Sequence, residues 1–312
     1  MFLEGGGVRV GETVYPVLND VIVLTDPSEY SHDVRLSLGG SRGTVPRDDF
    51  AEDIQATFGA EWKDHSTVLP EHQKEFEAYF DLVDLEKLKD SRVCDLGCGM
   101  GRWSSFLKNK CRELVLVDFS DAVFMARKNL QDCPHALFFM GDLTKLPFRK
   151  DFADFLFCLG VLHHLPVPCL NEVRRLGRYA PRLLIFLYYA LDNRPFYFQW
   201  ILELVTLVRR TLSKIRSPFF RRTVSTLGAL FIYKPLVILG AVLNKVGCGS
   251  YVPLYDFYRE KSVQRIAQDV YDRFFTRIEQ RVYRRDIEKL TDTFAHVVVS
   301  KNLPYWHFVC EL

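Results

Sequence analysis

The chain has 312 residues, of which 48% are hydrophobic, and its formal net charge is +2. A chain of this size buries a large core and fits one large domain or one domain with additions. The near-zero charge gives no argument for a nucleic-acid or acidic partner. The eight cysteines are scattered without a CxxC pair, which favours a reducing, cytoplasmic setting over a disulfide framework or a zinc site.

The N-terminal residues 1–50 are expected to form a metal-free β-ribbon-like segment and a polar, glycine-rich linker. The stretch 8–30 resembles the second half of a small zinc-ribbon-like domain, in which cysteines precede a YPV tripeptide. The tripeptide matches at 15–17, but the first cysteine of the chain is Cys94. Without thiolates the segment has no zinc site, so we expect it to serve packing or partner contact.

Residues 51–90 have a helical pattern with aromatic side chains at helical spacing. Four of them stand out: Phe58, Trp62, Phe76 and Tyr79. Aromatic residues at this spacing either belong to a core or close over a ligand. The core interpretation is favoured for Phe76 and Tyr79, and both stay open for Trp62.

The middle of the chain, residues 91–191, alternates between two patterns. Short apolar runs predict strands at 91–97, 113–120, 136–142, 152–162 and 181–190. Helical patterns follow at 101–109, 121–131 and 170–179. Strands alternating with helices at this pitch indicate βαβ units and a mostly parallel sheet. A ligand of such a sheet sits beyond the carboxyl ends of the strands, where the strand order reverses.

Three glycines, Gly97, Gly99 and Gly101, occupy the turn after the first of these strands. Because glycine has no Cβ, the backbone can turn tightly there and approach a ligand closely. A GxGxG pattern alone is weak, since nicotinamide and flavin binders share it. Two acidic residues make the prediction of the ligand more specific. Asp118 closes the next strand and can accept the hydroxyls of a ribose, and Asp142 closes the third strand, where it can accept an adenine amino group.

With Asp95 in DLGCGMG and these acids in order, residues 90–190 resemble the class I S-adenosylmethionine-dependent methyltransferases of the small-molecule branch. The resemblance implies a Rossmann-like sheet of seven mostly parallel strands with the last one antiparallel. It implies S-adenosylmethionine as cofactor and S-adenosylhomocysteine as product. It assigns the cofactor to Asp95, Gly97, Gly99, Gly101, Arg102, Asp118, Phe119, Gly141, Asp142, Leu143, Leu159 and, from the lid at 51–90, Trp62. No metal ligand is expected.

Two adjacent histidines, His163 and His164, follow the fourth strand and lie near the expected acceptor. A histidine can take a proton from a hydroxyl or amine acceptor near neutral pH. The alternative is that the LHH stretch only supports its loop. Of the two, His164 is the stronger catalytic candidate.

Residues 192–262 are expected to form a helical cap insertion. From Leu204 to Tyr255 the chain has no Asp or Glu but eight Lys and Arg residues, and the apolar stretch 227–244 is interrupted by Lys234-Pro235. The interruption makes a membrane-spanning helix a poor interpretation. Either the cap packs on the sheet edge or on a second subunit as a homodimer, or residues 204–255 make a peripheral membrane contact with anionic lipid.

The C-terminal residues 263–312 are expected to complete the core with a helix at 286–294 and strands at 296–301 and 305–312. The stretch around PLYDFY and DVYDRFFT resembles a region that folds over the active site in related bacterial methyltransferases. It supplies the acceptor-side candidates Tyr255, Asp256, Tyr258, Asp272 and Arg273, with Arg281 and Tyr283 as weaker ones. Of these, Tyr255 and Asp256 join the histidines as catalytic candidates.

Together these patterns predict a cytoplasmic methyltransferase that methylates an oxygen or nitrogen of a small molecule, such as a secondary metabolite, sugar or lipid-like precursor. Two alternatives stay open: a catalytically inactive cofactor-binding subunit, and a lipid methyltransferase at a membrane surface. No nucleic-acid partner is expected, because aromatic and basic residues do not interleave as base stacking would need.

Overall fold

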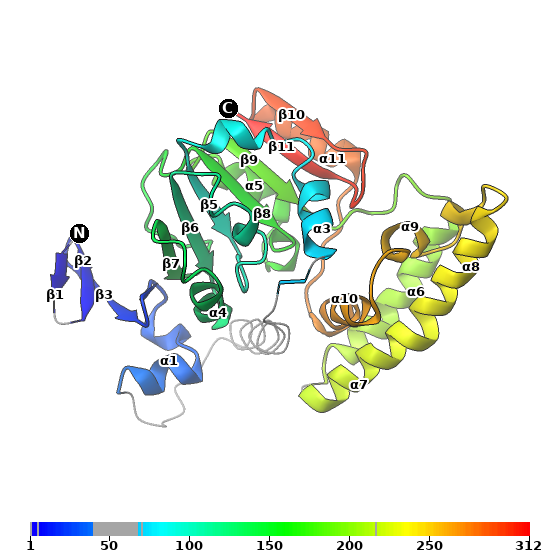
Figure 1. Ribbon diagram of the computed structural model, residues 1–312, viewed down its shortest axis with the longest axis horizontal. Helices are drawn as coiled ribbons and strands as arrows, with labels where there is room; N and C mark the ends of the chain where they lie inside the picture. Colours follow the sequence, from blue (N-terminus) through cyan, green and yellow to red (C-terminus); the bar gives the residue numbers. More distant parts are fainter. Residues whose placement is uncertain (1, 5, 40–67, 70, 216) are drawn as a thin grey trace.

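The computed structural model describes residues 2–4, 6–39, 68, 69, 71–215 and 217–312. These residues form one eleven-stranded sheet in the order β1-β2-β3-β4-β7-β6-β5-β8-β9-β11-β10 (Figure 1). The strands are β1 (Phe2–Glu4), β2 (Gly7–Val10), β3 (Thr13–Leu18), β4 (Val21–Val23), β5 (Arg92–Leu96), β6 (Glu113–Asp118), β7 (Ala136–Met140), β8 (Phe155–Leu159), β9 (Arg182–Phe186), β10 (His296–Val299) and β11 (His307–Glu311).

The central strands β7, β6, β5, β8 and β9 are all parallel. Strand β11 is antiparallel to both β9 and β10. The predicted α/β class and the antiparallel last strand are therefore confirmed. The count of seven strands was too low, because four further strands come from residues 2–23. The strand order reverses between β5 and β8, which is where a ligand of a doubly wound sheet binds.

The N-terminal ribbon continues the sheet. Strands β1, β2 and β3 pair antiparallel, whereas β4 runs parallel to β7, with Val21 opposite Phe138 and Val23 opposite Met140. Val21 and Val23 are fully buried, so β4 covers an apolar edge that would otherwise be open to pairing. Within the described part of the chain, no group of three or more metal-binding side chains comes together.

The described helices are α1 (His32–Ser37), α3 (Glu71–Tyr79), α4 (Ala122–Asn129), α5 (Cys169–Leu176), α6 (Tyr197–Leu212), α7 (Pro218–Gly228), α8 (Lys234–Asn244), α9 (Tyr255–Tyr258), α10 (Val263–Phe275) and α11 (Arg284–Glu288). Single 3₁₀ turns lie at Pro27–Glu29, Leu85–Leu88, Ser104–Phe106, Leu162–His164, Gly249–Tyr251 and Lys289–Asp292. The helix predicted at 286–294 is thus divided between α11 and the turn that follows it.

Both faces of the sheet are buried, as parallel strands require. Along β5, Val93 packs with α3 and α4, whereas Cys94 and Leu96 pack with α5 and the region around α11. This alternation follows from the two-residue period of a strand. It also directs Asp95, which lies between Cys94 and Leu96, toward the same face as Val93.

The helix predicted at 101–109 is wrong, because the structure has turns and one 3₁₀ turn there. Two serine hydroxyls explain the difference. Ser105 Oγ donates to the Gly101 carbonyl and Ser104 Oγ donates to the Asp95 carboxylate. Such bonds offer the chain an alternative to regular helix.

Helices α6 to α10 form a separate block beside the sheet (Figure 1). Helix α10 packs against α6 and α7, so the helical block extends past residue 262. The small core of the block gathers Ala229, Tyr233, Val237, Tyr258 and Ile266.

Lys234-Pro235 interrupts the apolar stretch but not the helix, since α7 and α8 form one helix, Pro218–Asn244. A π-helical turn at Ala229–Tyr233 joins them. Such a turn accommodates a proline, which lacks an N–H and clashes with the preceding turn. Among the described residues, this helix alone is long and apolar enough to cross a membrane by length and composition, and 22% of its most apolar window is buried.

The packing of α8 on α9 depends on Gly240. A Cβ at this position would lie 2.4 Å from Tyr255 Cγ. We therefore expect Gly240→Ala to lower the free energy of unfolding by about 1–3 kcal/mol through overpacking, although alanine is the better helix former. Urea unfolding measures the change.

The matched control is Gly228→Ala in α7, where the nearest neighbour would be Val270 Cγ1 at 3.3 Å. There the helix propensity should dominate and stability should hold or rise. A Gly240→Ala variant as stable as the control would contradict the close approach of α8 to Tyr255.

Candidate functional site

A cavity of about 1050 Å³ lies beyond the carboxyl ends of the central strands. Its sheet side is lined from five strand ends in turn, by Gly97, Asp118, Asp142, Leu159 and Phe186. Its other wall comes from helices α6, α7, α8 and α10 of the helical block. This volume is at the upper end of the roughly 300–1,000 Å³ typical of small-molecule sites.

The three glycines adopt left-handed backbone conformations, with φ of 77°, 52° and 77° at Gly97, Gly99 and Gly101. Of these, Gly97 lines the cavity, and a Cβ there would lie 2.3 Å from Val161 Cγ2. The turn after β5 can therefore pack directly on the turn after β8. Gly101 instead allows close contact with α4, because its Cβ would meet Ala126 Cβ at 3.2 Å.

Asp118 lies at the tip of β6 and lines the cavity. Its Oδ1 accepts both the N–H and the hydroxyl of Ser120, at 2.8 and 2.7 Å, and its Oδ2 accepts the Gly99 N–H at 2.8 Å. Burial raises the pKa of this carboxyl despite these bonds. Each carboxylate oxygen has two acceptor positions, so Oδ2 can accept one further donor from a ligand.

Asp142 lies at the tip of β7 and also lines the cavity. Its Oδ1 accepts the N–H and hydroxyl of Thr144, and its Oδ2 lies 3.5 Å from Lys145 Nζ. Lys145 in turn pairs with Glu29 at 2.6 Å, which brings the N-terminal ribbon to the cavity wall. Four further predicted cofactor residues line the cavity, namely Phe119, Gly141, Leu143 and Leu159.

Asp95 lies below the cavity floor and is not among the lining residues, and the same holds for Gly99 and Gly101. Its carboxylate accepts the Ser104 hydroxyl at 2.7 Å. Burial raises the pKa of Asp95 to about 8, with the Ser104 bond opposing the rise. The group is therefore neutral at pH 7 and holds the glycine turn from beneath.

Arg102 lines the cavity, with its guanidinium carbon 4.4 Å from the centre of the Trp103 ring. Burial lowers the pKa of Arg102, and nearby Arg265 lowers it further. A guanidinium in this position is suited to a carboxylate ligand, which it can bind through two bonds. Trp62, the remaining cofactor candidate, lies outside the described residues.

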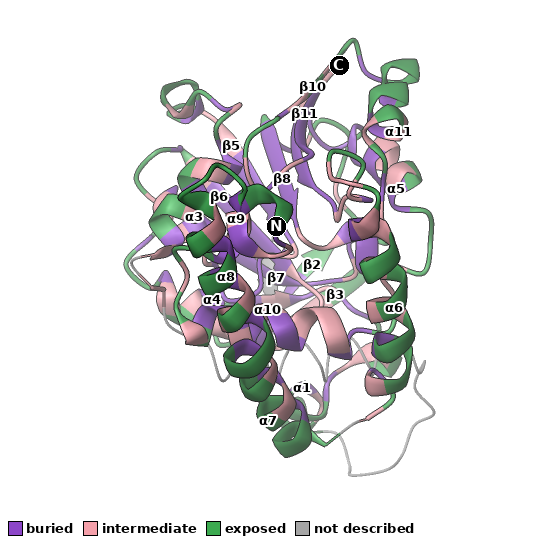
Figure 2. Ribbon diagram, turned by 90° about the vertical axis from the view of Figure 1, so that its right-hand side faces the viewer, coloured by how far each residue is buried: buried purple, intermediate pink, exposed green. Residues whose placement is uncertain are grey.

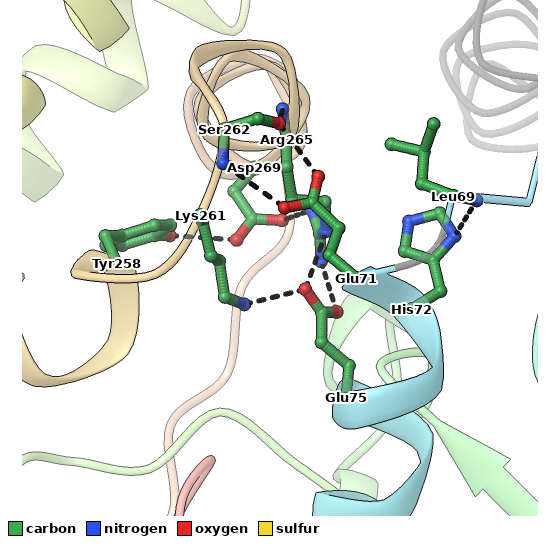
Figure 3. A network of polar contacts seen from close by, with 9 residues as sticks. All are labelled: Leu69, Glu71, His72, Glu75, Tyr258, Lys261, Ser262, Arg265 and Asp269. Carbon is green, nitrogen blue, oxygen red and sulfur yellow. Dashed lines mark hydrogen bonds and ion pairs between the residues drawn. The ribbon is translucent and has the colours of Figure 1, made fainter.

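A buried network of charges joins α3 to α10 (Figure 3), and the charge of Arg102 acts on Glu75 of this network. Glu75 of α3 accepts both Arg265 Nε and Nη2 at 3.1 Å and pairs with Lys261 at 3.0 Å. Arg265 also bonds to Asp269, which accepts the Tyr258 hydroxyl at 2.9 Å. The opposed charges lower the pKa of Glu75 despite its burial. The network therefore fastens the helical block to the sheet.

The far end of the cavity holds polar side chains around the Tyr188 ring. His164 lies 5.6 Å from it between ring centres, and the guanidinium carbons of Arg273 and Arg281 lie 5.3 and 5.5 Å from its centre. Arg281 pairs with Glu279 at 2.8 Å. The Nε of Arg273 is buried and has no hydrogen-bond partner among the described residues.

The two histidines differ in their surroundings. His164 lines the cavity, and its Nδ1 lies 2.8 Å from the Ile278 carbonyl. A carbonyl only accepts, so Nδ1 carries the proton and Nε2 the lone pair in the neutral ring. Burial lowers the pKa of His164, which keeps it neutral at pH 7. His163 stacks on Tyr188 at 3.9 Å and does not line the cavity.

The two catalytic candidates of the helical block also differ in whether they line the cavity. Asp256 lines the cavity and is held by Arg194 at 2.7 Å. Tyr255 is buried beneath Gly240 and Gly249 and lies outside the cavity wall. Its position indicates a packing contact between α8 and α9.

Three lining features were missed from the sequence. Tyr188 lies two residues after the end of β9, so its place near the carboxyl end of a strand was an available signal. Glu29 reaches the site through the pairing of β4 with β7, for which no local pattern exists. The apolar residues of α6 that line the cavity, such as Leu202 and Val205, have the pattern of any packed helix.

Comparisons with known proteins agree with this arrangement. Residues 94–184 match the family model of a methyltransferase domain. A search of the curated proteins finds no match. Neither the family match nor the structures below support the zinc-ribbon resemblance of residues 8–30.

Among solved structures, the chain is similar to the PH0226 protein of Pyrococcus horikoshii, at 26% identity and a TM-score of 0.33, over 38% of this chain and 58% of that one. It is similar to a SAM-dependent methyltransferase from Aquifex aeolicus, at 22% identity and a TM-score of 0.31. That match covers 43% of this chain and 83% of the other. It is also similar to magnesium protoporphyrin IX methyltransferase from Synechocystis with bound SAM, at 22% identity and a TM-score of 0.32. That match covers 48% of this chain and 67% of the other. The chain thus spans less than two thirds of the Pyrococcus protein.

The family match and the observed strand order define the central part of this chain as a class I S-adenosylmethionine-dependent methyltransferase domain. S-adenosylmethionine is the cofactor of this domain. The residues present fit that molecule, because a side-chain-free turn at Gly97 and an acceptor position on Asp118 both face the cavity. The class I methyltransferase domain and the cofactor predicted from the sequence are therefore confirmed, whereas the small-molecule branch stays a prediction.

The buried carboxyl of Asp95 predicts a pH-dependent stability. In the folded chain it stays protonated up to about pH 8, whereas in the unfolded chain it ionises near pH 4. The folded state therefore binds the extra proton, and this group makes the free energy of unfolding fall as pH rises between those values. Asp95→Asn removes the dependence.

The free energy of unfolding of Asp95→Asn should rise relative to that of the native chain by up to about 1.4 kcal/mol for each pH unit from about pH 5 to about pH 8. Urea unfolding of both proteins across that range measures the difference between their free energies of unfolding. The contributions of the other titrating groups cancel in this difference. A gap that is constant with pH would show that Asp95 is ionised in the folded chain.

Proposed function

We propose that this chain transfers the methyl group of S-adenosylmethionine to an oxygen or nitrogen of an amphiphilic small molecule. One observation carries the proposal: a single cavity joins the carboxylates at the strand tips, a polar cluster around Tyr188 and a largely apolar wall from the helical block. Such a cavity suits a molecule with a polar head and an apolar body, because each part is buried against surroundings of its own kind.

The cofactor end uses the residues that the family resemblance indicates. Asp118 would accept a ribose hydroxyl at Oδ2, Asp142 would accept the adenine amino group, and Arg102 would hold the carboxylate. Phe119 and Leu143 would pack on the flat base. When bound, S-adenosylmethionine supplies a methyl group that is already activated on a sulfonium.

The acceptor end uses the cluster around Tyr188. The Nε of Arg273 has a hydrogen to donate and would orient an accepting atom of the polar head. His164 Nε2 carries a lone pair at neutral pH and would take the proton of the attacking hydroxyl or amine. Since displacement at a methyl carbon is in line, positioning of this atom is the main contribution of the protein.

The cofactor side is tested by calorimetric titration with S-adenosylmethionine. Asp118→Asn should weaken binding at least about tenfold, because an amide offers fewer acceptor positions and adds donors that face the Gly99 and Ser120 N–H groups. Asp132→Asn, which alters a carboxylate paired with Lys108 on the surface, should bind as the native chain does. Equal affinities in all three proteins would overturn the assignment of Asp118.

The acceptor side is tested with tritiated S-adenosylmethionine and a fractionated extract of small molecules. We expect label in the solvent-extractable, amphiphilic fraction. His164→Gln and Arg273→Met should each lower transfer by about 10²-fold or more while cofactor affinity holds. Arg285→Met, at a residue stacked on Tyr283 outside the cavity, serves as control.

Label in a strictly water-soluble fraction, in protein or in nucleic acid would contradict the amphiphilic acceptor. Cofactor binding with no transfer to any fraction would favour an inactive cofactor-binding subunit instead.

A further inference from the structure

Helices α6, α7 and α8 contain many exposed residues (Figure 2), and a large share of these are apolar. On α6 the residues recur at helical spacing and are 60–69% exposed: Phe196, Trp200, Leu204 and Leu207. On α7, α8 and the turn between them, a second stripe is 47–73% exposed: Leu227, Phe231, Ile238, Val242 and Val246. We call these two stripes the outer apolar face. Exposed patches of this extent mark interaction sites in soluble proteins.

The opposite side of the long helix is packed on the protein. Buried residues recur every three or four positions: Arg221, Ser225, Ala229, Tyr233, Val237 and Gly240. Arg221 Nε donates to the Ile215 carbonyl at 2.7 Å, and its guanidinium lies over the Phe275 ring. A helix that crossed a bilayer would lose these contacts. The helix is therefore placed to lie along a surface, with the protein on one side and an apolar phase on the other.

Apart from Glu203 of α6, which is exposed between Trp200 and Leu207, the charged residues of α6, α7, α8 and their connections are positive. No Asp or Glu occurs from Leu204 to Tyr255. Around the connection between α6 and α7, the side chains of Arg210, Lys214 and Arg222 are exposed, next to Phe219, which is 81% exposed. Positive charge at the edge of an apolar face complements the phosphates of an anionic lipid surface.

The same charges disfavour a second copy of the chain as the occupant. In a two-fold dimer the same patch meets itself. A dimer formed through this connection would bring like charges together without an acid in the stretch to balance them, and like charges at an interface are unfavourable.

We propose that the outer apolar face docks on the surface of a lipid bilayer that contains anionic phospholipid, with Phe219, Trp200 and Phe231 inserted at the level of the headgroups. The chain lies on the membrane and does not cross it. The basic residues around the connection between α6 and α7 contact the lipid phosphates.

The cavity opens toward this face. Ile201, Leu204, Val208 and Ile232 line the cavity and are also exposed. An acceptor with an apolar body could therefore pass from the bilayer between α6 and the long helix without crossing water. This entry route rests on the proposed function, whereas the docking does not.

Vesicle flotation tests the docking with the full chain. The probes are vesicles of phosphatidylcholine alone and of phosphatidylcholine with phosphatidylglycerol. We expect the native chain to float with both and to prefer the anionic vesicles. The double variant Phe219→Ser/Phe231→Ser should lose at least about tenfold in partitioning for each side chain. Val298→Ser, at an exposed apolar residue of β10, is the matched control and should bind normally.

The triple variant Arg210→Gln/Lys214→Gln/Arg222→Gln tests the contribution of positive charge to vesicle binding. Each lost charge should weaken binding to anionic vesicles by about fivefold and leave binding to phosphatidylcholine unchanged. Trp200 supplies a second readout, because its fluorescence should shift to the blue on docking and be quenched by brominated lipid. The fourth tryptophan, Trp62, lies outside the described residues, so both proteins carry Trp62→Phe. In that background Trp200→Phe should abolish most of the signal, since Trp103 and Trp306 are buried.

Failure of the native chain to float with either vesicle would overturn the docking. So would equal loss of binding in the Val298→Ser control, or a stable dimer by light scattering that the double variant converts to monomer. Vesicle binding by a chain that does not bind S-adenosylmethionine would support the docking and overturn the proposed function alone.

Discussion

The cavity of this protein depends on the buried ion pairs between Glu75 of α3 and Arg265 and Lys261 near the start of α10. These charges lie between the helical block and the sheet. Burying them is costly unless each is paired and hydrogen-bonded, and here Asp269 pairs with Arg265 and accepts the Tyr258 hydroxyl (Figure 3). The network makes a specific position of α10 favourable, and that position sets the distance between the strand tips and the opposite wall.

The two ends of the cavity follow from different parts of this arrangement. The cofactor end is built by parallel strands, whose carboxyl ends meet at one edge and bring Asp118 and Asp142 together. The acceptor end is built by chain segments that return from the helical block, and these place Arg273 and Arg281 around Tyr188. A methyl donor and an acceptor can therefore bind to separate structural units and meet at their junction. The strand tips that carry Asp118 and Asp142 lie within the family-matched residues 94–184, whereas Arg273 and Arg281 lie outside them.

Local patterns predicted the parts of the structure that local physics decides. The buried apolar runs, the glycine turn and Asp118 at a strand tip were readable because each depends on a few neighbouring residues. The helix expected at 101–109 failed, and the Ser104 hydroxyl there bonds to Asp95 of β5 while the Ser105 hydroxyl bonds to the Gly101 carbonyl. Pro235 lies within a continuous helix because a π-helical turn precedes it, which the sequence alone did not indicate. The pairing of β4 with β7 and the cavity wall from α6 depend on contacts distant in sequence, which no local pattern encodes.

The short path from Glu29 through Lys145 to Asp142 has a consequence for where this enzyme unit begins. Residues that precede the family-matched region by more than sixty positions contribute a carboxylate beside the nucleoside end of the cavity. The turn that follows the ribbon thus contributes to the cavity wall. A chain shortened to the family-matched region would lack this carboxylate, so the cavity as observed extends over more of the polypeptide than the family match does.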